Sequence, residues 1–218
     1  MRGEGVMSKK ADFVFIINFK TYKHGQEVLK LARIAEKVDK KIIVGVPATE
    51  IREVSRKTRL RVYAEHVDPF EPGRNTGFVL PEAVKAAGAE GTFLNHSEHP
   101  VEFPVLKKTI ERCKSIGLKV AAFAPNIAEA KKIEKLNPDF LIMEPPELVA
   151  GTISVSSAKP ELIKKMSREI KMPFLVGAGI KNREDVRVAA ELGSSGIAVA
   201  SGITLAENPR KEIEELKL

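Results

Sequence analysis

A small set of side chains in this sequence could carry out proton transfer, and each of them follows a short apolar run. They are Asn18 and Lys20 after residues 13–17, His96 after residues 92–94, and Glu144 after residues 140–143. A carboxylate and an imidazole can move protons, and an ammonium group can stabilise the negative charge that forms. Any one of these side chains alone has an ordinary structural explanation, because most lysines are simply solvated and a lone histidine is commonly hydrogen-bonded.

The stretch Asn95-His96-Ser97-Glu98 marks an abrupt change from apolar to polar residues. A serine followed by an acidic residue is typical of a helix N-terminus, so we expect a helix to start at Ser97. The positive end of a helix dipole disfavours a charged imidazole. This position would therefore keep His96 neutral.

Two turns rich in small residues follow later apolar runs and suit a phosphate group. Residues 177–179 read Gly-Ala-Gly, and residues 200–202 read Ala-Ser-Gly. Small side chains let backbone amides approach an anion, and the N-terminus of a short helix adds positive potential. An ordinary tight turn would explain either one, but the two together favour phosphate binding.

The elements that must position these residues alternate regularly along the chain. Eight apolar runs are separated by helical segments, and they cover residues 13–17, 42–46, 61–64, 92–94, 119–123, 140–143, 174–176 and 197–200. Such alternation predicts a parallel α/β sheet, and eight units predict a (β/α)8 TIM barrel in which all strand C-termini meet at one face. An open doubly wound sheet is the structural alternative. We expect one compact domain over residues 1–218, with residues 1–10 as a flexible N-terminal extension.

Composition narrows the range of partners. The net charge is +7, but lysine pairs such as those at residues 40–41 and 164–165 are scattered among glutamates, as on solvated helix faces. We therefore expect no nucleic acid partner. No apolar run approaches the ~20 residues that a membrane span needs, and the first ten residues lack the apolar core of a signal peptide. With the single Cys113, this favours the cytoplasm.

No combination of residues in the sequence predicts a metal site or a cofactor site. His96 and His99 are three residues apart but lack a convincing third ligand. No Gly-x-Gly-x-x-Gly follows the first apolar run, which weakens a dinucleotide-binding interpretation.

Taken together, the motifs resemble those of triosephosphate isomerases, in particular the compact archaeal branch. In chain order they are Asn18-Phe19-Lys20, Asn95-His96-Ser97-Glu98, Glu-Pro-Pro-Glu-Leu-Val at residues 144–149, Gly-Ala-Gly-Ile at residues 177–180, and Ala-Val-Ala-Ser-Gly at residues 198–202. The resemblance implies interconversion of D-glyceraldehyde 3-phosphate and dihydroxyacetone phosphate in glycolysis and gluconeogenesis, without a cofactor. It also implies a homo-oligomer, a tetramer in preference to a dimer.

The resemblance also implies a role for each matching residue. Glu144 would be the base, His96 a neutral electrophile, Lys20 the stabilising cation and Asn18 a hydrogen-bonding partner of substrate oxygen. Phe19 would belong to the substrate-binding motif, and Asn95 and Glu98 would support His96 and Lys20. The phosphate would be held by backbone amides near Val149, Gly179, Ala200 and Ser201.

Two more positions are implied by the resemblance. Gly151 would lie at the tip of a lid, and Thr76 would lie in a loop that docks beside a neighbouring subunit's site.

The sequence departs from the family pattern at two places. His99-Pro100 stands where a basic residue commonly follows the Ser-Glu pair, and Ala150-Gly151-Thr152 replaces the usual Gly-Thr-Gly of the lid. Two alternatives remain open at this level. One is another phosphate-binding barrel enzyme, such as a sugar-phosphate epimerase, and the other is a non-catalytic basic protein that binds nucleic acid.

Overall fold

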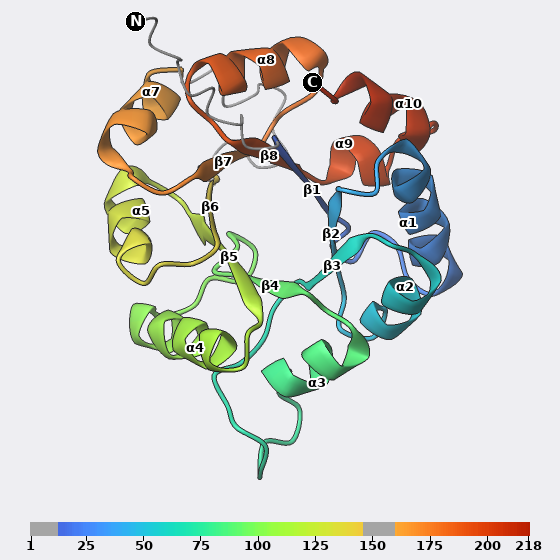
Figure 1. Ribbon diagram of the computed structural model, residues 1–218, viewed down its shortest axis with the longest axis vertical. Coiled ribbons are helices and arrows are strands. Elements are labelled where there is room, and N and C mark those ends of the chain that lie inside the picture. The colour runs from blue at the N-terminus through green and yellow to red at the C-terminus, as the bar shows by residue number, and fades with distance from the viewer. Residues whose placement is uncertain (1–12, 146–159) are drawn as a thin grey trace, which may run out of the picture.

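The computed structural model describes residues 13–145 and 160–218, which form a closed barrel of eight parallel strands (Figure 1). The strands are β1 (Val14–Asn18), β2 (Ile43–Val46), β3 (Arg61–Ala64), β4 (Gly91–Leu94), β5 (Lys119–Ala124), β6 (Phe140–Met143), β7 (Phe174–Gly177) and β8 (Gly196–Val199). Each strand pairs with the next, and β8 pairs with β1, so the predicted (β/α)8 barrel is confirmed and the open sheet is excluded.

Helices surround the barrel on its outer side (Figure 1). They are α1 (Gln26–Val38), α2 (Ile51–Lys57), α3 (Pro81–Ala87), α4 (Phe103–Ser115), α5 (Ile127–Glu134), α7 (Pro160–Glu169), α8 (Arg183–Glu191), α9 (Ser201–Thr204) and α10 (Pro209–Glu215). Among the residues that the structure describes, no helix has both the length and the apolar character to cross a bilayer.

The strands are mostly apolar because both of their faces are buried. One core lies inside the barrel and includes Ile16, Tyr63, Phe93 and Leu175, and a larger one lies between the strands and the helices. Gly45 shows how tightly the interior is filled, because a Cβ at this position would lie 2.0 Å from Cε2 of Phe93. This packing holds the strand ends in fixed positions.

The helix start expected at Ser97 is wrong. Residues 96–99 form a turn, in which the His99 amide donates to the His96 carbonyl at 2.8 Å, and α4 begins only at Phe103. A turn that contains serine and the first turn of a helix share the same residue preferences, so the sequence alone favours both equally.

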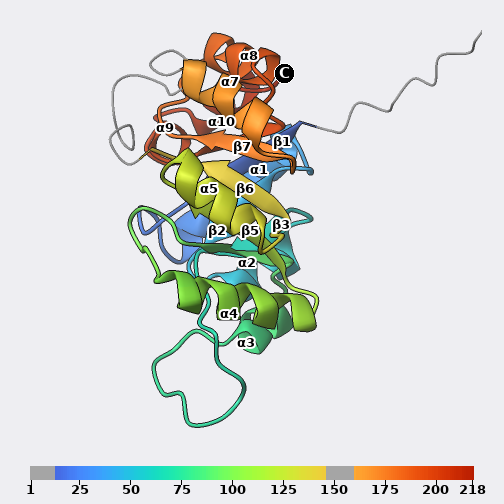
Figure 2. The same cartoon turned by 90° about the vertical axis from the view of Figure 1, so that its left-hand side faces the viewer.

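The connection between β3 and α3 projects away from the barrel as a long loop (Figure 2). At its base, Asp68 and Val79 are joined by two hydrogen bonds, from the Asp68 amide to the Val79 carbonyl and from the Val79 amide to Asp68 Oδ2. Phe70 packs against Phe78 with ring centroids 4.5 Å apart, yet Phe78 remains 54% exposed. The loop is thus internally ordered while presenting an apolar ring to solvent.

Candidate active site

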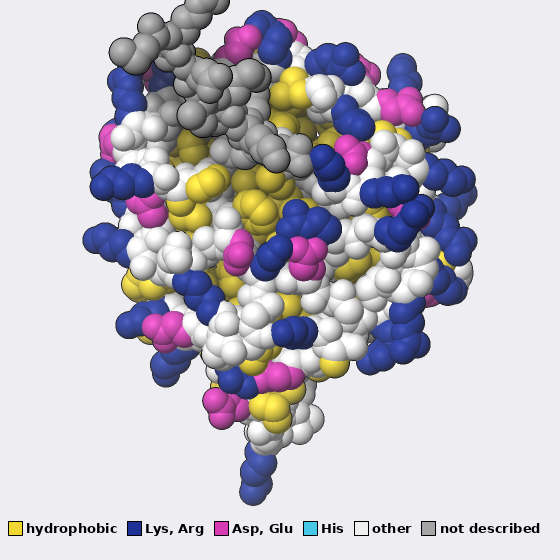
Figure 3. All heavy atoms as spheres, in the orientation of Figure 1, with side chains coloured by type: hydrophobic (Ala, Val, Ile, Leu, Met, Phe, Trp, Pro, Cys, Tyr) yellow, Lys and Arg dark blue, Asp and Glu magenta, His cyan; other side chains and the backbone are white. Residues whose placement is uncertain are grey.

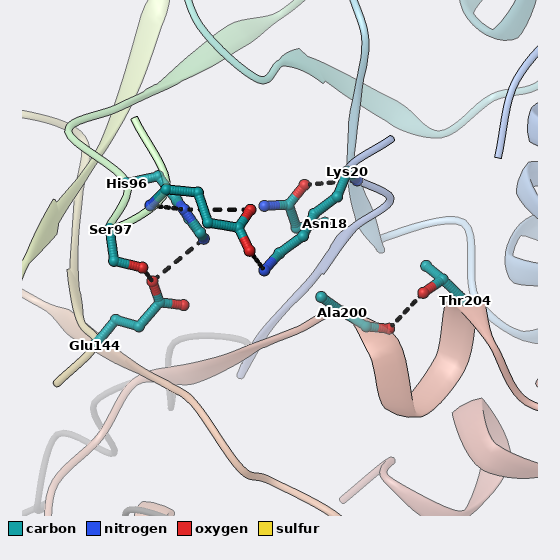
Figure 4. A network of polar contacts seen from close by, with 8 residues as sticks. Asn18, Lys20, His96, Ser97, Glu144, Ala200 and Thr204 are labelled. Carbon is teal, nitrogen blue, oxygen red and sulfur yellow. Dashed lines mark hydrogen bonds and ion pairs between the residues drawn. The ribbon is translucent and has the colours of Figure 1, made fainter. Parts of the chain in front are cut away.

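The side chains singled out from the sequence meet in one pocket at the C-terminal ends of the strands (Figure 4). Asn18 and Lys20 follow β1, His96 follows β4, and Glu144 follows β6. The other lining residues come mainly from the segments after β7 and β8, and they include Gly179, Ala200 and Ser201. The barrel therefore brings together residues that lie far apart in the sequence.

The turn after β4 fixes the tautomer of His96. The backbone N–H of Glu98 donates to His96 Nδ1 at 3.0 Å, so Nδ1 accepts and the ring proton must reside on Nε2. The expected helix start is absent, but this single amide supplies the same effect, because a ring that accepts at Nδ1 is neutral. His96 is buried, and its ring meets the edge of Phe123 at a centroid distance of 4.8 Å.

The Glu144 carboxylate is held against this imidazole. Its Oε2 lies 3.2 Å from His96 Nε2 and accepts a hydrogen bond from the Ser97 hydroxyl at 3.0 Å (Figure 4). Glu144 is only 8% exposed. On its other side lies Gly177, where an added Cβ would come within 3.3 Å of Oε1. The carboxylate is thus confined between a hydroxyl, an imidazole and a bare stretch of backbone.

Lys20 faces the same pocket from β1. Its ammonium group lies 2.7 Å from Glu98 Oε1, and its side chain is only 12% exposed. The Lys20 backbone has a positive φ of 49°, and its N–H donates to Asn18 Oδ1 at 3.0 Å. Because that oxygen is occupied, the Nδ2 group of Asn18 is the one left to meet a ligand.

The turn after β7 and the start of α9 supply closely approaching backbone. Ala178 and Gly179 have φ of 83° and 69°, so both lie in the left-handed region. Ala200 precedes α9, and its carbonyl accepts from the Thr204 hydroxyl at 3.2 Å (Figure 4). These segments present backbone rather than bulky side chains to the pocket.

Asn95 supports the site without entering it. Its Nδ2 donates to the Phe123 carbonyl at 3.0 Å, and its Oδ1 accepts from the Val101 amide at 3.1 Å. It also has a positive φ of 59°. Asn95 therefore ties the end of β4 to β5 and fixes the direction in which His96 projects.

Some expected site residues lie elsewhere. The side chain of Phe19 is fully buried in the outer core and does not line the pocket. Thr76 lies on the projecting loop. The expectations for Val149 and Gly151, and that for residues 1–10, fall outside the described residues.

Sequence analysis missed several residues that belong to the site. Ser97 contacts Glu144 directly, and Tyr22, Ile180 and Lys181 line the pocket. Each lies within a few residues of a predicted strand end. This proximity is the feature of the sequence that could have identified these residues as part of the site.

Many charged side chains elsewhere on the protein form ion pairs. On the face in Figure 3, Lys and Arg side chains lie around the rim with Asp and Glu among them. Examples on helix faces are Lys57 with Glu53 at 2.8 Å and Lys132 with Glu129 at 2.8 Å. Within residues 13–145 and 160–218, no three His, Cys, Asp or Glu side chains are grouped so that they could hold a metal ion.

A closed (β/α)8 barrel with a carboxylate, a neutral imidazole and an ammonium group at one set of strand ends defines a barrel enzyme that works by proton transfer. Comparison with known proteins makes this more specific. The family model described as triosephosphate isomerase matches residues 13–124, and one described as thiazole biosynthesis protein ThiG matches residues 125–218.

Curated relatives cover nearly the whole chain. A triosephosphate isomerase from Methanocaldococcus jannaschii is 38% identical over 214 residues, which is 93% of this chain and 98% of that protein. One from Saccharolobus solfataricus is 40% identical over 212 residues, 93% of each. The chain belongs to the triosephosphate isomerase family and is of the archaeal type.

A solved structure supports the fold independently. The thiamine phosphate pyrophosphorylase from Pyrococcus furiosus aligns with a TM-score of 0.63 at 22% identity, covering 93% of this chain and 92% of that one. At this identity the likeness concerns the barrel alone.

Proposed function

We propose that this protein interconverts D-glyceraldehyde 3-phosphate and dihydroxyacetone phosphate, by moving one proton between adjacent carbons through an enediolate. We further propose that it does so as one domain over residues 1–218, in the cytoplasm, in glycolysis and gluconeogenesis. The observation that carries the proposal is the placement of Glu144, His96 and Lys20 around one pocket. Family membership supports it, since the curated relatives are triosephosphate isomerases.

Glu144 is the base in this scheme. Its carboxylate takes the proton from the carbon beside the carbonyl, and the electron pair of that C–H bond forms the C=C bond of the enediolate. The same carboxyl group then returns the proton to the neighbouring carbon, so no net oxidant or reductant is required. Oε2 is held by Ser97 and His96 before substrate arrives, which keeps the base in the pocket.

His96 and Lys20 stabilise the charge that develops on oxygen. Because Nδ1 accepts from the Glu98 amide, the Nε2–H of His96 is the donor that can polarise the carbonyl oxygen. The ammonium group of Lys20 offsets the negative charge of the enediolate and of the phosphate. The Nδ2 group of Asn18 donates to a substrate oxygen, since its Oδ1 is already occupied.

Backbone amides near Gly179, Ala200 and Ser201 are proposed to hold the phosphate group, as small-residue turns and helix N-termini do elsewhere. Two further positions lie outside the described residues and are assigned by sequence resemblance alone: Val149 to the phosphate-binding amides and Gly151 to the tip of a lid. Closing the pocket would keep water from the enediolate, which otherwise eliminates its phosphate.

The protein is also proposed to form a homo-oligomer, a tetramer in preference to a dimer. The projecting loop that carries Thr76 and the exposed Phe78 is suited to dock beside the site of a neighbouring copy. A second contact is available at Phe103 and Val105 of α4, each 38% exposed. Analytical ultracentrifugation tests this, because replacing both α4 residues by serine should convert a tetramer into dimers.

A coupled assay with glyceraldehyde 3-phosphate tests the activity. We expect turnover that a chelator leaves unchanged, and Glu144→Asp should lower kcat by about 100-fold or more because the shorter side chain misplaces the base. Glu129→Asp on the exposed face of α5 is the matched control and should behave like the wild type. Full activity of Glu144→Asp, or no turnover by the wild type, would contradict the proposal.

A further inference from the structure

The turn between β7 and α8, residues 178–181, lines the active-site pocket in a backbone conformation that few side chains adopt. Ala178 and Gly179 both have a positive φ, of 83° and 69°. In the part of the chain that the structure describes, the amides of Gly179 and Ile180 donate to no acceptor. Successive amides of a turn can form a concave site for an anion. The conformation at Ala178 persists only when neighbouring groups hold it.

Two side chains at the start of α8 hold the end of this turn. Asp185 Oδ2 accepts from the Lys181 amide at 3.0 Å, and Asn182 Oδ1 accepts from the Asp185 amide at 3.0 Å. The arrangement resembles a capping box, in which two side chains of the first helical turn bind the backbone reciprocally. Asp185 is only 7% exposed. A carboxylate buried to this degree is stabilised by such donors and by the positive end of the helix dipole.

Helix α8 gives the pair a fixed base. The Arg183 guanidinium donates to the carbonyls of Glu214 and Glu215 at the end of α10, each at 3.3 Å. Val186 and Ala189 of α8 are fully buried in the outer core. Because the start of α8 is held on both sides, the end of the turn is held relative to the barrel as well.

We propose that Asn182 and Asp185 are positioning residues for the substrate phosphate: they keep the backbone of residues 178–181 in the conformation that binds it. This inference rests on the proposed function, because it takes the phosphate of that substrate as the ligand. Neither residue lines the pocket, so both act through the turn rather than by contact with the substrate. When the pair is broken, the turn relaxes toward ordinary backbone angles, and phosphate binding has to restore the competent conformation at the expense of affinity.

A defect of this kind has a distinct kinetic signature. The base and the electrophile follow β6 and β4, so a relaxed turn after β7 leaves Glu144 and His96 in place. The loss should therefore appear mainly as a higher KM and as weaker competitive inhibition by inorganic phosphate, with kcat changing less. A general loss of stability would not separate these quantities.

The test compares two variants that each lose one asparagine cap. In Asn182→Ala, the inhibition constant for inorganic phosphate and KM for glyceraldehyde 3-phosphate should both rise by about 5- to 10-fold, with kcat within about twofold of the wild type. Asn208→Ala is the matched control, because Asn208 Oδ1 caps α10 in the same way by accepting from the Lys211 amide at 3.1 Å. The thermal midpoints of both variants should fall alike, but Asn208→Ala should keep the wild-type inhibition constant.

Two substitutions of Asp185 separate its hydrogen bond from its presence in the core. Asp185→Asn keeps an oxygen that can accept from the Lys181 amide, whereas Asp185→Ala does not. We expect Asp185→Asn to bind inorganic phosphate within about twofold of the wild type, and Asp185→Ala to bind it at least as weakly as Asn182→Ala. If Asp185→Ala does not fold, the comparison of Asn182→Ala with Asn208→Ala still decides the inference.

Several results would overturn the inference. One is an unchanged inhibition constant in Asn182→Ala, and another is an equal rise in Asn208→Ala. A fall in kcat with an unchanged inhibition constant would also do so, since it would place the effect at the reacting carbons.

Calorimetric titration with inorganic phosphate repeats the comparison without turnover. If the wild type binds phosphate but does not convert glyceraldehyde 3-phosphate, the proposed function fails, and the titration of Asn182→Ala still judges the role of the pair. A wild type that binds no phosphate would overturn the inference itself.

Discussion

The Ser97 hydroxyl lies 3.0 Å from Glu144 Oε2, so the residue that follows His96 in sequence anchors the carboxylate that follows β6. The same oxygen lies 3.2 Å from His96 Nε2. One short turn after β4 thus places both the proposed electrophile and the anchor of the proposed base. The position of the Glu144 carboxylate relative to the His96 ring therefore depends on this turn and not on β6 alone.

Ser97→Ala should lower kcat/KM about tenfold. A hydrogen bond to a charged group contributes about 1.5–3 kcal/mol, and its loss lets Glu144 leave the position beside His96. Steady-state kinetics measures the effect, and circular dichroism checks that the fold is retained. Ser115→Ala on α4, far from the pocket, is the control. Unchanged kinetics in Ser97→Ala would show that His96 alone positions the base.

Glu98→Gln should raise KM for the phosphorylated substrate by about 3- to 10-fold while kcat changes less. The substitution removes the charge that pairs with Lys20 but keeps the backbone amide that orients His96. The effect is modest because the Glu98 side chain is 55% exposed, and solvent weakens such pairs. The pair should also weaken as salt is added. Steady-state kinetics at two ionic strengths measures the change in KM and its dependence on salt. A fall in kcat by the same factor as the rise in KM would indicate that the substitution disturbs His96 instead.

Glu65 should make the protein less stable as the pH rises from about 4.5 to 7. The pKa of this carboxyl group is raised from its ordinary value of 4.5 to about 7 by burial, so between these values the folded state binds more protons than the unfolded state. Stability is therefore lost over this window and levels off above it. Glu65→Gln should be more stable than the wild type at pH 8, by on the order of 2–3 kcal/mol, and nearly equal at pH 4.5.

Urea unfolding at the two pH values checks this prediction, at protein concentrations chosen so that wild type and variant have the same oligomeric state. Glu214→Gln makes the same chemical change on the outer face of α10, where Glu214 pairs with Arg210, and should show no comparable gain at pH 8. Equal stability of Glu65→Gln and the wild type at pH 8 would mean that the carboxyl group ionises at no cost.

Ala178→Gly should stabilise the fold by about 1 kcal/mol. Ala178 has a φ of 83°, a conformation that costs a residue with a Cβ about 1–3 kcal/mol. Glycine adopts this φ without strain, and its only cost is the larger conformational entropy that it loses on folding. Ala83→Gly, an exposed position within α3, is the matched control and should destabilise by about 0.5–1 kcal/mol. Urea midpoints measure both. Destabilisation by Ala178→Gly would indicate that its methyl group packs favourably enough to offset the strain.

The strand ends were predictable because strands buried on both faces leave uninterrupted apolar runs, and the polar residue after each run marks where the strand stops. This is why Asn18, His96 and Glu144 could be placed at one end of a barrel. The same rule applied to β3 would have identified Glu65, which follows Ala64 directly and was missed. The next residue, His66, stacks on His99 in the structure, a contact that its place in the sequence does not indicate.

Other features could not be predicted because they depend on the choice between similar local conformations or on tertiary packing. Ser97 with Glu98 suits a helix start and a turn equally well, and only the position of α4 decides between them. Phe19 belongs to a motif shared with the pocket residues, yet its side chain points into the outer core. Neighbours in sequence need not share a site.

The pairing of β1 with β8, which closes the barrel, joins the first and last strands of the chain, with Val14 beside Gly196 and Ile17 beside Val199. Asn18 and Lys20 are synthesised long before Ala200 and Ser201. Contacts between such distant segments form late and slowly. A nascent chain can therefore form most of its helices and strands before the proposed site is assembled. The site is complete only when β8 pairs with β1.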